Sequence, residues 1–247
     1  MRPPPPPVTS GPAPAIHQFD VDGGAKAPPD RTETAVSNPL PHISETTVRS
    51  ILHIGDNATI IRYVTEGVLY PTPIDRLVFT ATSPHASIFV TQGSHDTLTI
   101  DLNHERYSVK PASDKQMIEI HTRNGHDTVY IVDTLKNPFH IETGAGNDTV
   151  VTNAQHATVL TGDGNDIVMT GAGDSYINTG AGNDIVNASS AGTTVAYTGK
   201  GADFFRGGAG TNFVDTGDGD DVAVGGPGHN TLCGGDGDDL LTARSAS

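Results

Sequence analysis

The sequence predicts an all-β protein whose C-terminal half is a parallel β-solenoid, in which short coils of chain stack on one another. A nine-residue phrase recurs eleven times over residues 143–242, with one extra residue in the sixth copy. Each phrase has a glycine-rich half that suits a turn and a three-residue half that suits a short strand. Two phrases, or eighteen residues, therefore make one flattened coil. Successive coils would stack at the ordinary strand spacing of about 4.8 Å.

The eighth position of the phrase identifies the interior of the solenoid. Because successive side chains of a strand point to opposite faces, a position that stays apolar must face a shared core. Ten of the eleven residues at this position are large and apolar. The full set is Val150, Val159, Val168, Ile177, Val186, Val195, Phe205, Val214, Ala223, Leu232 and Leu241. We expect these side chains to fill a thin core between two sheets.

The chain before the repeats divides into two further segments. Residues 1–45 are rich in Pro, Ser, Thr and Gly, which predicts a disordered tail. Residues 46–133 contain short alternating runs such as RLVFTAT and DTLTIDL, which predict irregular β-strands leading into the solenoid. The solenoid is expected to span 134–247, and degraded copies of the phrase are visible at 122–130 and 134–142. No part of the segment before the repeats, from about 50 to 132, has a helical periodicity.

The sixth position of the phrase alternates between copies. Odd-numbered copies carry a carboxylate there, at separations of 18, 18, 19, 18 and 18 residues: Asp148, Asp166, Asp184, Asp203, Asp221 and Asp239. Even-numbered copies carry Ala157, Ser175, Asn212 and Asn230, and the irregular sixth copy has no clear equivalent. Because alternate copies lie on opposite edges of the coil, the sequence predicts a column of carboxylates along one edge only.

Such a column repels itself strongly unless a cation neutralises it. Over residues 143–242, thirteen Asp against Lys200 and Arg206 leave a net charge of −11. Calcium suits this arrangement better than magnesium, because it accepts six to eight oxygen ligands in flexible geometry, including backbone carbonyls. Six Asp leave five gaps between coils, and Asp127 in the degraded copy is a further candidate ligand. We therefore expect about five Ca²⁺ sites. Further ligands would be backbone carbonyls near Gly144, Gly146, Gly162, Gly164, Gly180, Gly182, Gly199, Gly201, Gly217, Gly219, Gly235 and Gly237.

The phrases TGAGNDTVV, TGDGNDIVM, TGDGDDVAV and GGDGDDLLT resemble the G-G-x-G-x-D-x-U-x nonapeptide of haemolysin-type calcium-binding (RTX) repeats. The resemblance covers roughly 122–242. It implies a right-handed parallel β-roll with calcium in the turns, in a secreted bacterial protein. Residues 102–131 also resemble the strand–loop–strand segment that precedes such repeats in some secreted proteins. One departure is that position one is usually Thr instead of Gly, and we expect the turn to survive it.

Composition excludes several other classes of protein. A net charge of −15 argues against nucleic-acid binding, and no apolar run is long enough for a transmembrane helix. The single Cys233 rules out an intrachain disulfide and a cysteine-based zinc site. The eleven His, including His121 and His126, lack zinc-protease spacing and are better explained as exposed polar residues. The ladder Asn147, Asn165 and Asn183 at position five is interpreted as ordinary polar turn residues.

Three functional hypotheses remain, and no catalytic constellation of residues supports an enzyme. The first is a non-enzymatic calcium-binding module that folds on binding calcium. The second is the repeat region of a secreted enzyme, toxin or effector whose catalytic part is missing or lies in 46–133. The third is an adhesin or carbohydrate-binding module that uses a flat sheet face. We expect secretion machinery or a cell-surface molecule as partner. The C-terminal secretion signal that the resemblance implies would lie beyond residue 242, and the Pro-rich tail also suits delivery into a host cell.

Overall fold

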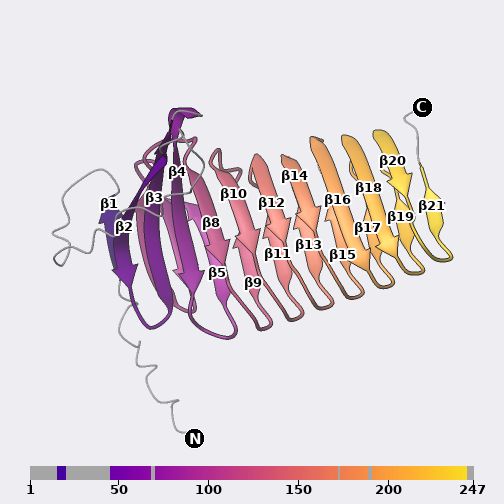
Figure 1. Ribbon diagram of the computed structural model, residues 1–247, viewed down its shortest axis with the longest axis horizontal. Helices are drawn as coiled ribbons and strands as arrows, with labels where there is room; N and C mark the ends of the chain where they lie inside the picture. The colour runs from indigo at the N-terminus through magenta and orange to yellow at the C-terminus, as the bar shows by residue number, and fades with distance from the viewer. Residues whose placement is uncertain (1–15, 21–44, 68–69, 172, 189–190, 244–247) are drawn as a thin grey trace, which may run out of the picture.

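The computed structural model describes residues 16–20, 45–67, 70–171, 173–188 and 191–243. Over these residues the chain is all β, with no helix and therefore none that is long and apolar enough to cross a membrane. Parallel coils stack into a β-solenoid of about seven turns, as the repeats predict. Figure 1 shows the coils following one another in chain order along the long axis of the molecule.

The strands form two sheets that face each other across the core. The eleven-stranded sheet has the order β1 (Ile16–Asp20), β7 (Glu105–Lys110), β6 (Leu98–Leu102), β5 (Ser87–Gln92), β9 (Thr128–Ile131), β11 (Thr149–Thr152), β13 (Ile167–Thr170), β15 (Ile185–Ala188), β17 (Phe204–Arg206), β19 (Val222–Val224) and β21 (Leu240–Thr242). The ten-stranded sheet has the order β2 (Glu45–Ile54), β3 (Ala58–Gly67), β4 (Tyr70–Ala81), β8 (Met117–His121), β10 (Pro138–Glu142), β12 (His156–Leu160), β14 (Asp174–Asn178), β16 (Thr193–Lys200), β18 (Thr211–Asp218) and β20 (His229–Cys233).

The repeat sets the register of these sheets. Val150 pairs with Val168 and Val168 with Val186, so each residue lies beside the one eighteen positions later. The side chains of all three are fully buried. Identical positions therefore stack on one another along the solenoid, and the eighth position forms the predicted thin core.

The sixth copy of the phrase corrects one assignment. Val195 was predicted to point inward, but it is half-buried on the outer face, and Ala196 is the buried residue that pairs with Ile177. The extra residue therefore lies in the turn before β16, which shifts the strand by one position and reverses its two faces. The same register places Thr194 beside Ser175, so the sixth copy has an equivalent of position six after all.

The last coil departs from the pattern for a different reason. Leu232 is only partly buried and Leu241 is 41% exposed, although both occupy position eight. Within the described residues no further coil packs against β20 and β21. Position eight is buried only where coils lie on both sides.

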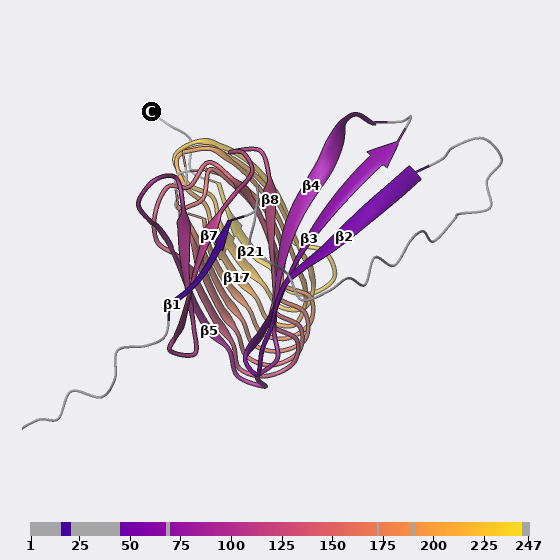
Figure 2. The ribbon, with the colours of Figure 1, turned by 90° about the vertical axis from the view of Figure 1, so that its left-hand side faces the viewer.

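The residues before the repeats extend both sheets. Two antiparallel meanders, β2–β3–β4 and β5–β6–β7, join the solenoid where β4 pairs in parallel with β8 and β5 with β9. This agrees with the irregular strands predicted for this part. Figure 2 shows β2, β3 and β4 projecting away from the stacked coils. Their inner residues Leu77 and Phe79 continue the apolar core of the coils.

Of the predicted disordered tail at 1–45, the structure describes only Ile16–Asp20 and Glu45, the first residue of β2. Ile16–Asp20 forms β1, which adds in parallel to the edge of β7, with Phe19 beside Val109. These five residues form a strand, and the division of the chain at residue 45 remains a prediction. An edge strand offers unpaired amides and carbonyls, and a short segment can pair with them whatever its flanking composition.

Candidate metal centre along one edge

Seven Asp form a single column along one edge of the solenoid: Asp127, Asp148, Asp166, Asp184, Asp203, Asp221 and Asp239. The first six are at most 3% exposed, and Asp239 on the last coil is partly exposed. The backbone amide of each of the first six Asp donates a hydrogen bond to Oδ1 of the Asp one coil later. The N–O distance is 2.8 Å in five of these bonds and 3.0 Å in the last.

The second oxygen of these carboxylates has no partner. Oδ2 is buried and accepts no hydrogen bond in Asp127, Asp148, Asp166, Asp184, Asp203 and Asp221. A buried carboxylate oxygen without a donor is costly, and native proteins rarely leave one so. Six of them recur at the same place in successive coils, and their chemistry fits a bound group that supplies positive charge.

The electrostatics of the edge agree with this interpretation. Burial raises the pKa of Asp148, Asp166 and Asp203 above the usual range for Asp, and raises the pKa of Asp184 to about 6. The backbone amides and nearby Thr hydroxyls only partly offset this effect, and Asp166 and Asp203 repel the charge on Asp184. Without a cation, these buried carboxylates therefore bind protons more tightly than exposed Asp side chains do.

Position one contributes a second ladder that the sequence alone did not reveal. In the odd-numbered copies the Thr hydroxyl at this position donates to a backbone carbonyl one coil later, as from Thr161 to Thr179 at 3.2 Å and from Thr179 to Thr198 at 3.0 Å. The Thr179 hydroxyl also lies beside Asp184 and lowers its pKa. The turn therefore survives Thr at position one, as expected, and the hydroxyl ties neighbouring coils together.

The glycines at positions two and four are required by the shape of this edge. Gly180 and Gly182 have φ values of +93° and +137°, which other residues rarely adopt. A Cβ at these positions would lie 2.2 Å from the carbonyl oxygen of Gly162 and 2.0 Å from that of Gly164. Backbone oxygens of one coil thus approach the next coil closely enough that only glycine fits.

Some predicted carbonyl ligands already have a partner. The carbonyl of Gly162 accepts the amide of Ala181 at 2.9 Å, and the carbonyl of Ala181 accepts the amide of Gly164 at 2.7 Å. A carbonyl oxygen has a second lone pair, so these bonds fix the turn without consuming its whole acceptor capacity. The predicted ligand set of glycine carbonyls remains a prediction.

The donor set favours a hard cation. No three side chains of His, Cys, Asp or Glu converge on one point in the described part of the chain. An ion on this edge would therefore take carboxylate oxygens from neighbouring coils and further oxygens from the backbone. All-oxygen ligands of this kind suit Ca²⁺, whereas Zn²⁺ prefers nitrogen and sulfur.

The opposite edge is closed by neutral side chains. Its column at position six runs through Ala157, Ser175, Thr194, Asn212 and Asn230. Asn212 Nδ2 donates to Asn230 Oδ1 at 2.8 Å, and Asn230 Nδ2 donates to the turn carbonyl of Gly226 at 2.8 Å. Among the described glycines, positive φ occurs only on the Asp edge and its extension to Gly125. On this edge, side-chain amides thus donate to turn carbonyls. On the other edge, a cation would bind oxygens of the same kind.

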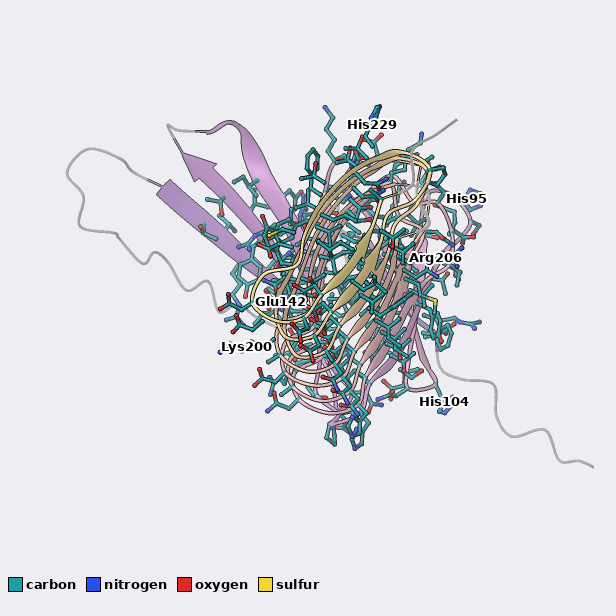
Figure 3. The ribbon with its side chains drawn as sticks, turned by 90° about the vertical axis from the view of Figure 1, so that its right-hand side faces the viewer. His95, His104, Glu142, Lys200, Arg206 and His229 are labelled. Carbon is teal, nitrogen blue, oxygen red and sulfur yellow. The ribbon has the colours of Figure 1, made fainter. Side chains whose placement is uncertain are left out.

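Two further polar sets from the sequence have structural roles. Asn165 and Asn183 each donate a backbone amide to the side-chain oxygen of the preceding Asn, at 2.9 and 2.7 Å. His126 accepts the amide of Asn147 at 2.7 Å through Nδ1. His121 lies elsewhere, on the sheet, with Nδ1 2.8 Å from Glu142. Figure 3 looks along the solenoid, with Lys200 marking the Asp edge and His229 marking the opposite edge.

Comparison with known proteins identifies the repeats. The family model of the RTX calcium-binding nonapeptide repeat matches in four copies, over residues 140–159, 160–191, 189–223 and 215–245. Comparison with the curated proteins and with the solved structures gives no match.

Proposed function

Because residues 140–245 are RTX calcium-binding nonapeptide repeats, we propose that calcium ions bind inside the coils along the Asp edge and hold successive coils together. The edge has seven Asp and therefore six gaps. Five gaps lie between Asp148 and Asp239, and the sixth lies between Asp127 and Asp148. Each ion would take a carboxylate oxygen from the coils on either side and backbone carbonyls from the glycine turns.

The row of buried, unpartnered Oδ2 atoms carries this proposal. An ion in each gap supplies the positive charge that the buried carboxylates lack. Five ions would bring +10 against the net −11 of residues 143–242. The repulsion between coils that otherwise opposes stacking is then almost cancelled.

Binding of calcium is coupled to folding in this proposal. The core of the repeats is thin, with one row of position-eight residues from each sheet, so apolar burial alone contributes little per coil. A ligand that binds the folded state and not the unfolded chain stabilises the fold by mass action. The coils would therefore order where calcium is plentiful, as outside the cell. This supports a secreted bacterial protein, in which the repeats are a calcium-dependent module.

Circular dichroism and calorimetry test this proposal on the full chain. We expect a strong β signal in millimolar calcium, a much weaker one in excess chelator, and recovery when calcium is restored. Titration with calcium should give several ions per chain, and titration with magnesium should give weaker binding. An equal β signal in calcium and in chelator, with no heat of calcium binding, would refute it.

A further inference from the structure

The outer face of the ten-stranded sheet carries a cluster of exposed aromatic rings. Tyr176 on β14, Tyr197 on β16 and Phe213 on β18 come from three successive strands and are 42%, 42% and 47% exposed. The rings of Tyr176 and Tyr197 lie 5.8 Å apart between centroids, with their planes tilted by 46°. Large exposed rings gathered on one flat face indicate a binding surface, because soluble proteins seldom leave such groups together without a partner.

Side chains that can hydrogen-bond lie on either side of these rings. Tyr176, Val195 and Phe213 form the central row. Asn178 and Asp215 flank Tyr197 in the next row. On the other side run Asp174, Thr193 and Thr211. The three rows together make a flat strip of rings bordered by amide, carboxylate and hydroxyl groups.

The charge of this strip restricts the class of ligand. Its three rows contain no Lys or Arg, and they include the carboxylates of Asp174 and Asp215. The whole chain has a net charge of −15. An acidic polysaccharide or an anionic lipid surface would be repelled here.

On the same coils, the opposite face of the solenoid provides a contrast. The equivalent outer row of the eleven-stranded sheet runs through Ile167, Ile185, Phe204, Val222 and Leu240. Phe204 is its one aromatic residue, and the others are aliphatic. An apolar protein partner would prefer that aliphatic row. The strip on β14, β16 and β18 instead combines ring faces with hydrogen-bonding groups. This combination matches a sugar, because the C–H faces of a sugar stack on rings while its hydroxyls form hydrogen bonds at the sides.

We propose that this strip of β14, β16 and β18 binds a neutral polysaccharide, laid across the rings. A flat face made of parallel strands suits an extended polymer better than a small molecule, which needs a concave pocket. The sugar contacts lie on the sheet face, away from the Asp edge. The proposal therefore goes beyond the calcium role and requires only that the solenoid be folded.

Affinity electrophoresis of the full chain in saturating calcium tests the proposal. The gels contain a soluble β-glucan, an α-mannan or a galactomannan, with alginate as the acidic comparison. We expect retardation by at least one neutral polymer and none by alginate. Tyr176→Ala, Tyr197→Ala and Phe213→Ala should each weaken binding roughly tenfold. Phe204→Ala is the matched control, since it removes a ring that is 39% exposed at the same repeat position on the opposite face.

Two further measurements separate binding from folding. Each variant should keep the calcium-dependent β signal of the parent, and Tyr197→Phe should retain most of the binding because the ring is kept. Retardation by none of the neutral polymers, or binding that survives all three ring deletions, would overturn the proposal. So would loss of binding in Phe204→Ala that equals the loss in Phe213→Ala. Polysaccharide binding with no calcium dependence of the fold would count against the calcium proposal alone.

Discussion

The backbone amide of Asp166 donates a hydrogen bond to Oδ1 of Asp184 at 2.8 Å, while Oδ2 of the same carboxylate is buried without a partner. One oxygen thus aligns neighbouring coils and the other is left for a cation. The same division recurs at every buried Asp of the edge, so alignment of the coils and metal binding depend on the same side chains.

Replacing Asp184 by Asn should separate these two roles. The amide oxygen of Asn can still accept from Asp166, but the charge shared by the gaps above and below is lost. We expect calorimetry to show about two fewer calcium ions per chain, because each ion needs a carboxylate on both sides. Asp215→Asn, which removes the same charge from the outer face of β18, should leave the number of ions unchanged. An unchanged number in Asp184→Asn would show that Oδ2 is not a ligand.

Asn212→Ala should affect stability without affecting calcium. Its Nδ2 donates to Asn230 Oδ1 at 2.8 Å and to the carbonyl of Gly208 at 3.3 Å. Deleting the side chain removes both bonds, including the one to the buried carbonyl of Gly208, at about 1–3 kcal/mol. We expect a lower melting temperature in saturating calcium, with the same calcium stoichiometry as the parent. Loss of an ion would mean that the neutral edge also binds calcium.

Much of the fold could be predicted from the sequence because the repeat is regular. The eighteen-residue spacing fixes which residues stack, and the alternation of strand faces then fixes that Val168 and Val186 point inward. Where the period breaks, at the sixth copy, this reasoning failed for Val195. A one-residue insertion can lie anywhere in the copy, and only its place decides which face the next strand presents.

The candidate site was predicted only in part, for a physical reason. The Asp column can be recognised in the sequence because carboxylates seldom recur by chance at the same position of every second copy. The Thr ladder at position one was present in the sequence, but Thr is common on exposed strands and turns, and its burial is not evident from its type. The exposed rings of β14 and β18 are not evident from the sequence as a whole, because position seven differs between odd and even copies. Only the even copies place Tyr176 and Phe213 at this position on one face.

In excess chelator, the protein should be more stable at pH 5 than at pH 7.5. The metal-free fold raises the pKa of Asp184 to about 6, and burial raises the pKa of Asp148, Asp166 and Asp203 in the same direction. An unfolded Asp has a pKa of about 3.9. The folded state therefore binds protons more tightly, so stability falls as pH rises through this interval.

Calcium should reverse this order, because the ion competes with protons for the same oxygens. Circular dichroism at the two pH values measures the β signal that remains in chelator, and thermal melts in saturating calcium measure the stability of the calcium-bound fold. A β signal in chelator at pH 7.5 that equals or exceeds the signal at pH 5 would contradict the raised pKa values.

Val186→Asp should unfold the repeats even in saturating calcium. Val186 is fully buried and pairs with Val168 on one side and Phe205 on the other, so a carboxylate there meets neither water nor a partner. Burying an unpaired charge costs several kcal/mol, a large share of a domain's total stability. Calcium cannot compensate, since the position lies in the strand and not at the glycine turns.

Asn187→Asp is the matched control for this substitution. Its side chain is half-buried on the outer face, and Arg206 lies beside it on the next strand. A new carboxylate there stays in contact with water and next to a positive charge, so we expect the melting temperature in calcium to stay close to that of the parent. If Val186→Asp melted like the parent while Asn187→Asp collapsed, the inner and outer faces of β15 would be the reverse of those described, and the position-eight core with them.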